Sequence, residues 1–120
     1  MLIVIDTARN QLQFELDAQG RGGEILTVPA DLDIGERGHL LGLELQLPDQ
    51  PPQAIVLDDR ADPYARTARV EATCLIGPDG ALRRVTVPRR GPGYELSYPS
   101  GNECWIDASG ARHCAITRSG

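Results

Sequence analysis

The chain has 120 residues and a formal net charge of -5, with 17 acidic residues, 12 arginines and no lysine. This length suits one domain that buries a core without disulfides or metals, and the acidic balance argues against a dedicated nucleic-acid binder. No run reaches the roughly 20 apolar residues of a membrane span, and three cysteines is an odd number, so we expect a soluble cytoplasmic protein in a reducing compartment.

Strand patterns begin near the start of the chain. Residues 2–5 are apolar, but the run is too short for a signal peptide and lacks a basic leader, so it predicts a strand. A turn is expected at residues 6–10. Apolar and polar residues then alternate over residues 11–16 and again over 41–47, and this period of two indicates half-buried strands.

One turn signature occurs five times: two residues compatible with a turn, then a glycine, with one further residue on either side. The copies occupy residues 17–21, 35–39, 77–81, 98–102 and 107–111. The spelling suits a type I turn whose glycine enters the left-handed region. Each copy therefore predicts a hairpin with a three-residue loop.

The copy at residues 35–39 conflicts with the strand pattern beside it. Strict pairing across that turn would put Asp31 and Asp33 on the same face as Leu41 and Leu43. Since acidic and apolar side chains belong on opposite faces, we predict a wider loop or a β-bulge there.

Acidic residues gather around the same turn. Asp31, Asp33 and Glu36 cluster there together with His39. The pattern Asp31-x-Asp33-x-Gly35 resembles the start of a calcium loop, but the remaining ligands of such a loop are missing. We predict no metal at this position.

Prolines interrupt the strand pattern over residues 48–67. Within this segment we expect a short edge strand at residues 54–57 and one turn of helix between residues 59 and 68. It would connect two β units, 1–47 and 68–120, inside a single domain of residues 1–120. The sequence Thr-Val-Pro occurs in both units, which indicates either an internal duplication or chance matching in a chain rich in Val, Leu, Gly and Pro.

Together these patterns predict an all-β fold. We expect an antiparallel hairpin meander of about nine or ten short strands that forms a sandwich or a flattened barrel.

The first third of the chain carries a series of short motifs in a fixed order. They are a strand at 2–5, Asp6, an aliphatic strand at 12–16, an acidic segment at 31–33, Gly38 and the strand Gly42-Leu43-Glu44-Leu45. Over residues 2–47 this order resembles the small bacterial family called domain of unknown function 2283. The chain departs from the family pattern by two extra residues between Asp33 and Gly38, and nothing after Leu47 matches. The resemblance implies a β fold and no functional residue, because the family has no established activity.

The last two turns predict cross-strand partners. Trp105 is expected opposite His113, and Glu95 opposite Trp105, so these three residues would form one row across three strands at the spacing of cross-strand neighbours. We interpret the row as a candidate shallow site for a small polar ligand, in which an acid and an imidazole flank an aromatic ring. The other interpretation is a solvated face whose one large residue packs under a loop or a partner chain.

The same register makes Cys104 and Cys114 direct neighbours, within the range of a disulfide. Their inward orientation favours two buried thiols, and a redox switch or a metal site that includes Cys74 is the alternative. The chain has no CxxC motif, and His113 is expected on the opposite face, so we predict neither a metal nor a cofactor.

Four arginines lie close together in the sequence: Arg83, Arg84, Arg89 and Arg90. Arg83 and Arg84 are candidates for binding phosphate or an acidic partner. The alternative is one alternating strand followed by a solvated loop at residues 89–93.

Charge is divided unevenly along the chain. Residues 1–60 hold 11 acids and 4 arginines, whereas residues 61–120 hold 6 acids and 8 arginines. We therefore predict a non-enzymatic binding or self-assembly module, a homo-oligomer that associates through strand edges or through the face of Trp105. A small ligand-binding protein or enzyme that uses Glu95, Trp105 and His113 is the alternative, and no catalytic residue is predicted.

Overall fold

The computed structural model describes residues 2–17, 22–59, 61–97, 103–106 and 109–114, and within these ranges the chain is all-β. The strands are β1 (Leu2–Asp6), β2 (Gln11–Glu15), β3 (Glu24–Ile34), β4 (Leu40–Leu45), β5 (Gln53–Val56), β6 (Arg66–Ile76), β7 (Leu82–Pro88), β8 (Arg90–Gly91), β9 (Tyr94–Glu95), β10 (Glu103–Ile106) and β11 (Arg112–Cys114). One 3-10 turn, η1 (Glu36–Gly38), joins β3 to β4. The predicted all-β, largely antiparallel fold is confirmed. In the described ranges no helix has the length and apolar character to cross a membrane.

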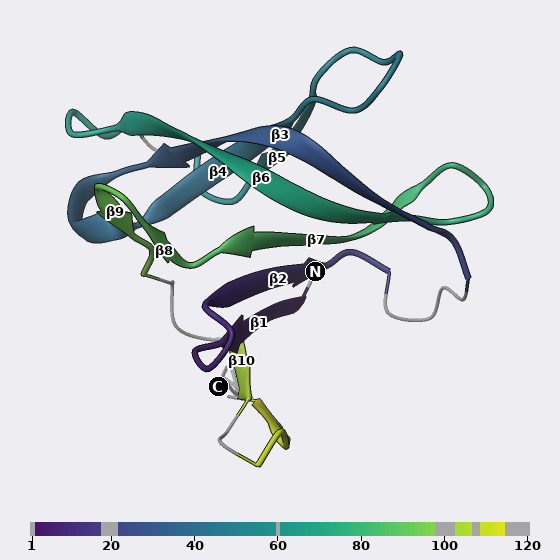
Figure 1. Ribbon diagram of the computed structural model, residues 1–120. Helices are drawn as coiled ribbons and strands as arrows, with labels where there is room; N and C mark the ends of the chain where they lie inside the picture. The colour runs from purple at the N-terminus through teal and green to yellow at the C-terminus, as the bar shows by residue number, and fades with distance from the viewer. Residues whose placement is uncertain (1, 18–21, 60, 98–102, 107–108, 115–120) are drawn as a thin grey trace, which may run out of the picture.

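Nine strands form one curled sheet in the order β11-β10-β1-β2-β7-β6-β3-β4-β5, and β8 pairs with β9 in a separate hairpin. Figure 1 shows the sheet folded into two layers, with β3, β4, β5 and β6 above β7, β2 and β1. The sheet bends from one layer into the other at the β6–β7 hairpin. There β6 pairs with β7 only over Thr73–Ile76, although it pairs with β3 along its whole length.

The core fills the space between the two layers. In β2, buried Leu12 and Phe14 alternate with more exposed glutamines, and in β3 Ala30 and Leu32 alternate with aspartates. Among the described residues, the core cluster consists of Ile3, Leu12, Phe14, Val28, Ala30, Leu32, Ile34, Leu40, Leu43, Leu45, Leu47, Ala72, Cys74, Val85, Val87, Tyr94 and Leu96. Burial of each large aliphatic side chain contributes about 1.5–3 kcal/mol to folding. The period-two pattern therefore sets which face of each strand turns inward.

Three local turns form as predicted. Residues 6–10 connect β1 to β2, and the turn at residues 77–81 closes the β6–β7 hairpin, with Gly80 at positive φ. β10 and β11 pair as a hairpin, with Gly110 at positive φ, while residues 107–108 lie outside the described ranges. The turn at residues 35–39 closes the β3–β4 hairpin, and the register shifts between Asp33 and Ile34. The predicted bulge is thus confirmed, and it returns Asp31 and Asp33 to the face opposite Leu32.

Two hairpin predictions fail in the sheet order. β2 pairs with β1 and β7, and β3 pairs with β4 and β6, so no β2–β3 hairpin forms across residues 17–21. β9 pairs with β8, so no β9–β10 hairpin forms across residues 98–102. Residues 18–21 and 98–102 themselves lie outside the described ranges. In both cases a distant strand occupies the position that a neighbour in sequence would have taken.

The proline-rich connection contains the predicted edge strand, which is β5 at the end of the sheet. The predicted turn of helix is wrong. Instead, the Ala65 amide donates to the Asp62 carbonyl (3.1 Å) and the Tyr64 amide to the Asp62 carboxylate (2.8 Å), forming a tight turn before β6. An aspartate that bonds the backbone two residues on competes with helix formation. Strands from residues 1–47 and 68–120 alternate in the sheet, and the division into two units stays a prediction.

Candidate functional site

The structure separates Glu95 from Trp105, so the predicted row of three residues does not form. β10 lies beside β1 in parallel, which puts Trp105 opposite Ile5, whereas Glu95 pairs with Arg90 in the β8–β9 hairpin. The prediction that Glu95 pairs with Trp105 is wrong, because β1 takes the place beside β10 that the turn signature assigned to β9.

The other half of the predicted register is confirmed. Trp105 lies opposite His113, and Cys104 lies opposite Cys114, in the β10–β11 hairpin. The His113 side chain is exposed. The Trp105, Cys104 and Cys114 side chains lie outside what the structure describes.

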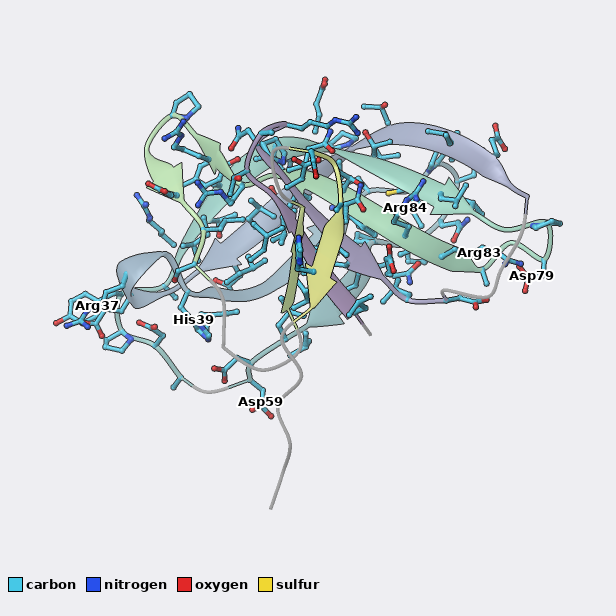
Figure 2. The ribbon with its side chains drawn as sticks, turned by 90° about the horizontal axis from the view of Figure 1, so that it is seen from below. Arg37, His39, Asp59, Asp79, Arg83 and Arg84 are labelled. Carbon is cyan, nitrogen blue, oxygen red and sulfur yellow. The ribbon has the colours of Figure 1, made fainter. Side chains whose placement is uncertain are left out.

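The arginines that are close in sequence are apart in space. Arg83 lies near the start of β7 and Arg89 lies just past its end, so six residues of extended chain separate their Cα atoms by about 20 Å. The Arg83 side chain is only 12% exposed and lies between Asp17 (3.6 Å) and Asp79 (3.9 Å). Figure 2 shows Arg83, Arg84 and Asp79 at the opposite end of the molecule from Arg37. Arg83 is therefore a partner of acids in its own chain.

Five carboxylates line a hollow of about 500 Å³ on the outer face of the layer formed by β3, β4 and β5. These are Asp31, Asp33, Glu44, Asp58 and Asp59, and we call this site the acidic hollow. Asp31 and Asp33 reach it because they alternate with core residues along β3, and Asp31 pairs with Glu44 of β4. Asp58 and Asp59 come from the chain that leaves β5. Pairing of three strands thus collects acids that are up to 28 positions apart in the sequence.

Small residues leave room for the acidic hollow. Gly42, Ala54 and Thr67 lie among its lining residues, on three different strands. A Cβ atom on Gly42 would lie 2.7 Å from the Ile55 carbonyl oxygen, which is closer than real Cβ contacts come. Glycine at this position therefore allows the close approach of β4 and β5 that forms the floor.

One cation partly offsets the charge of the acidic hollow. Arg69 binds Asp31 through two nitrogens (2.6 and 3.3 Å), and the His39 ring contacts another of the carboxylates, with Nε2 2.9 Å from Asp58 Oδ2. Within the described part of the chain, no ion pair links Asp33 or Asp59 to a cation. Figure 2 shows Asp59 at the edge of the molecule, on the same side as His39. The hollow therefore keeps a surplus of negative charge.

The carboxylates of the acidic hollow are too dispersed for a single metal ion. Among the residues that the structure describes, no three His, Cys, Asp or Glu side chains gather closely enough to hold one. Dispersed carboxylates match a ligand whose positive charges are themselves spread along its length. The sequence indicated part of this site through Asp31, Asp33 and His39. The contributions of Glu44, Asp58 and Asp59 depend on which strands pair.

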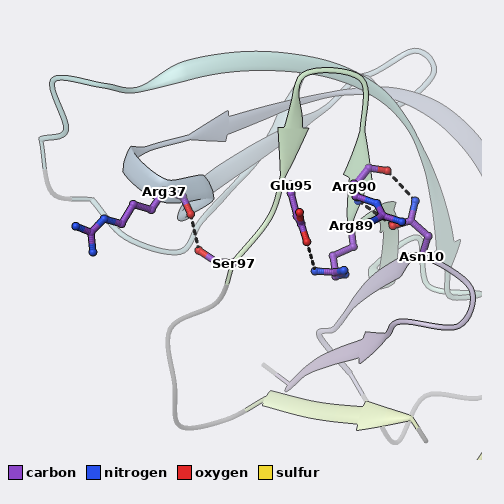
Figure 3. A network of polar contacts seen from close by, with 6 residues as sticks. All are labelled: Asn10, Arg37, Arg89, Arg90, Glu95 and Ser97. Carbon is purple, nitrogen blue, oxygen red and sulfur yellow. Dashed lines mark hydrogen bonds and ion pairs between the residues drawn. The ribbon is translucent and has the colours of Figure 1, made fainter. Parts of the chain in front are cut away.

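A second hollow contains Glu95. The Arg89 side chain donates to the Glu95 carboxylate (3.2 Å), and Thr7 and Ser97 add hydroxyl groups to its lining. Figure 3 shows the Arg89–Glu95 contact, and it shows the Arg37 guanidinium directed away from both residues. Since Arg89 and Glu95 already neutralise each other, this hollow has less capacity for a charged ligand than the acidic hollow.

Cys74 lies in the core, and burial raises the pKa of its thiol above the ordinary value. The thiolate is the reactive form, so we expect Cys74 to react with thiol reagents at pH 8 at least about 100-fold more slowly in the native protein than in urea. The measurement uses the double variant Cys104→Ser, Cys114→Ser, in which Cys74 is the remaining cysteine. Equal rates in buffer and in urea would contradict the buried position.

No family model, curated protein or solved structure matches this chain.

Proposed function

We propose that the protein is a non-enzymatic binding module that docks an extended, basic segment of a partner in the acidic hollow and along β5. The observation that carries the proposal is the acidic hollow itself, in which five carboxylates share the lining with apolar residues of β5. A reducing, cytoplasmic setting and association into homo-oligomers form part of this proposal, as the odd number of cysteines and the uneven charge of the two halves indicate.

Strand β5 supplies the second element of the proposed site. It pairs with β4 on one side and, among the strands that the structure describes, ends the sheet on the other. An edge strand offers backbone groups to an added strand, and that mode of recognition gives affinity through the main chain and specificity through side chains. Val56 is 67% exposed at the end of β5, so an added strand would also cover apolar surface.

The magnitude of the charge effect sets the kind of partner. An exposed ion pair contributes only about 0.2–1 kcal/mol, so a single cation would bind weakly. A segment that carries several arginines or lysines makes several such pairs at once. Since these pairs are screened, binding should weaken as ionic strength rises.

We expect the double variant Asp33→Asn, Asp59→Asn to bind a basic peptide about 2- to 30-fold more weakly than the wild type, because two exposed ion pairs are lost. The measurement is fluorescence anisotropy of a short fluorescein-labelled peptide in which arginine alternates with valine. Protein concentrations are kept in the range where light scattering shows a monomer. Each titration is run at low and at high salt.

The matched control is Glu24→Gln, which removes one exposed acid at the far end of β3. It should leave the affinity within about twofold of wild type, since seven or more residues of extended chain separate it from the acidic hollow. Equal affinities for the wild type, the double variant and the control would exclude the acidic hollow as the binding site.

A further inference from the structure

One edge of β6 has no strand beside it over most of its length. β6 pairs with β3 from Arg66 to Ile76, but with β7 only from Thr73 to Ile76. Within the described ranges, the segment from Arg66 to Ala72 therefore has one open edge. This edge faces a hollow of about 560 Å³ whose far wall includes Pro92 and Tyr94.

The residues after Val87 show why β7 leaves β6. Pro88 has no N–H to give to a ladder, and its carbonyl accepts a hydrogen bond from the Tyr94 hydroxyl (3.1 Å). The Arg89 amide then donates to the Asn10 carbonyl (3.1 Å), and the Arg90 amide donates to the Asn10 side chain (2.9 Å). These bonds hold the chain against the β1–β2 turn and away from β6.

Backbone N–H and C=O groups of successive residues point to alternate sides of a strand, which shows which groups face the open edge of β6. The Gln46 amide donates to the Pro29 carbonyl (3.0 Å), so the odd-numbered residues of β3 bond β4 and the even-numbered ones bond β6. On β6, the partners of those even-numbered residues are Ala68 and Val70. The backbone groups of Thr67, Arg69 and Glu71 therefore point to the open edge.

The β4–β5 ladder alternates in the same way. The Leu57 amide donates to the Leu41 carbonyl (2.9 Å), and Ile55, two residues earlier, pairs with Leu43 in the same phase. The backbone groups of Ala54 and Val56 therefore point away from β4, to the other open edge. In the part of the chain that the structure describes, the layer of β6, β3, β4 and β5 thus has one open edge on each side.

Charge and exposed apolar groups match when the two edges run antiparallel. Antiparallel pairing brings the end of β5, which leads to Asp58 and Asp59, to the start of β6 at Arg66. It also places Val56 and Tyr64, each 67% exposed, at the same end of the contact. Parallel pairing would instead carry the two aspartates toward Glu71.

We propose that the partner segment is the open edge of β6 in a second copy of this chain, which pairs antiparallel with β5 and places Arg66 against Asp58 and Asp59. This inference rests on the proposed function and names the partner of the same site. Neighbouring strands of the β6, β3, β4, β5 layer alternate in direction. An antiparallel β5–β6 contact therefore relates two copies by translation and twist, so the contact is heterologous and leads to an open chain of subunits.

The test blocks each edge separately. Ala54→Pro removes an outward N–H from β5, and Arg69→Pro removes one from β6, while edge positions tolerate proline. Neither variant alone should form an open assembly of subunits, because each keeps only one edge that can pair. An equimolar mixture should form a dimer of one copy of each, with twice the mass of one chain in size-exclusion chromatography with light scattering.

Two further variants control for side-chain loss. Arg69→Ala removes the same ion pair to Asp31 as Arg69→Pro but keeps the N–H. Its β6 edge should therefore still pair with the open β5 edge of Arg69→Pro. Likewise, the β5 edge of Ala54→Ser should pair with the open β6 edge of Ala54→Pro. Circular dichroism checks that all four variants keep the wild-type β signal, and the dimers should dissociate as salt rises.

The outcomes separate this inference from the proposed function. If the mixture stays monomeric while the wild type still binds the arginine peptide, the second-copy partner is wrong and the basic-segment site stands. If the mixture forms the dimer but the peptide does not bind, the general site for basic segments is wrong and the self-association stands. A wild type that stays monomeric at every concentration and ionic strength overturns the inference.

Discussion

Replacement of Phe14 with alanine is expected to lower the free energy of unfolding by about 3–5 kcal/mol. Phe14 is fully buried and is the only phenylalanine of a chain in which aromatic residues make up 4%. It lies on β2 between Ile3 of β1 and Val85 of β7, so its ring fills the centre of the lower layer. Small neighbouring side chains cannot close the cavity without moving two paired strands.

Urea unfolding followed by circular dichroism measures this change. Phe14→Leu keeps most of the volume and should cost less than half as much, and Tyr64→Ala removes an exposed ring and should change the free energy by no more than about 0.5 kcal/mol. If Phe14→Ala destabilises no more than Tyr64→Ala does, the assignment of the core to this face of β2 is wrong.

Replacement of Gly38 with alanine is expected to lower the free energy of unfolding by more than about 2 kcal/mol. Gly38 has φ of +77°, a region that costs an alanine about 1–2 kcal/mol, and an added Cβ would collide with the carbonyl oxygen of Glu95. The Gly38 carbonyl also accepts a hydrogen bond from the Ser97 amide (2.8 Å). The substitution therefore pushes η1 and β9 apart as well as straining the turn.

Gly93→Ala is the matched control for Gly38→Ala. Gly93 has a similar φ of +81°, and no atom lies within 4 Å of the position of its added Cβ. This variant should show the conformational cost of about 1–2 kcal/mol alone, and the excess loss in Gly38→Ala measures the contact with β9. Equal losses in the two variants would show that η1 and β9 are not in close contact.

Local features of the fold could be predicted from the sequence. Period-two alternation assigned the inward faces of β2 and of β4 from Leu43 onward, whereas Leu41 lines the acidic hollow. The glycine turns placed the β6–β7 and β10–β11 hairpins, and the β10–β11 register is as predicted, but a shift between Leu75 and Ile76 moves the β6–β7 pairing by one residue. These signals work because a turn and the strands beside it are set by residues close together in the sequence. The same local logic identified the bulge beside Asp33 from a conflict between turn and pattern.

Nonlocal pairing could not be predicted in this way. No turn signals that β1 lies beside β10, or that β6 and β7 come between β2 and β3. The candidate site depended on such pairings. The row of Glu95, Trp105 and His113 was lost when β1 took the place beside β10, and the acidic hollow formed when β3, β4 and β5 lay side by side.

Sequence proximity also misleads along an extended chain. Arg83 and Arg89 belong to one short arginine-rich stretch, but a strand lies between them, and each contacts a different acid. Arg83 contacts Asp17, and Arg89 contacts Glu95. Charges gather on a β protein across strands, at positions that only the sheet order reveals.

The parallel β1–β10 pair has a consequence for the order of folding. Ile3 pairs with Glu103, so this contact closes nearly the whole chain into one loop. Loop-closure entropy grows with the logarithm of loop length, and contacts between distant residues form slowly. The β1–β2 pair is local, and β2–β7 joins it to the rest of the sheet. We therefore expect the β10–β11 hairpin to attach last, with β1 as the strand on which it docks.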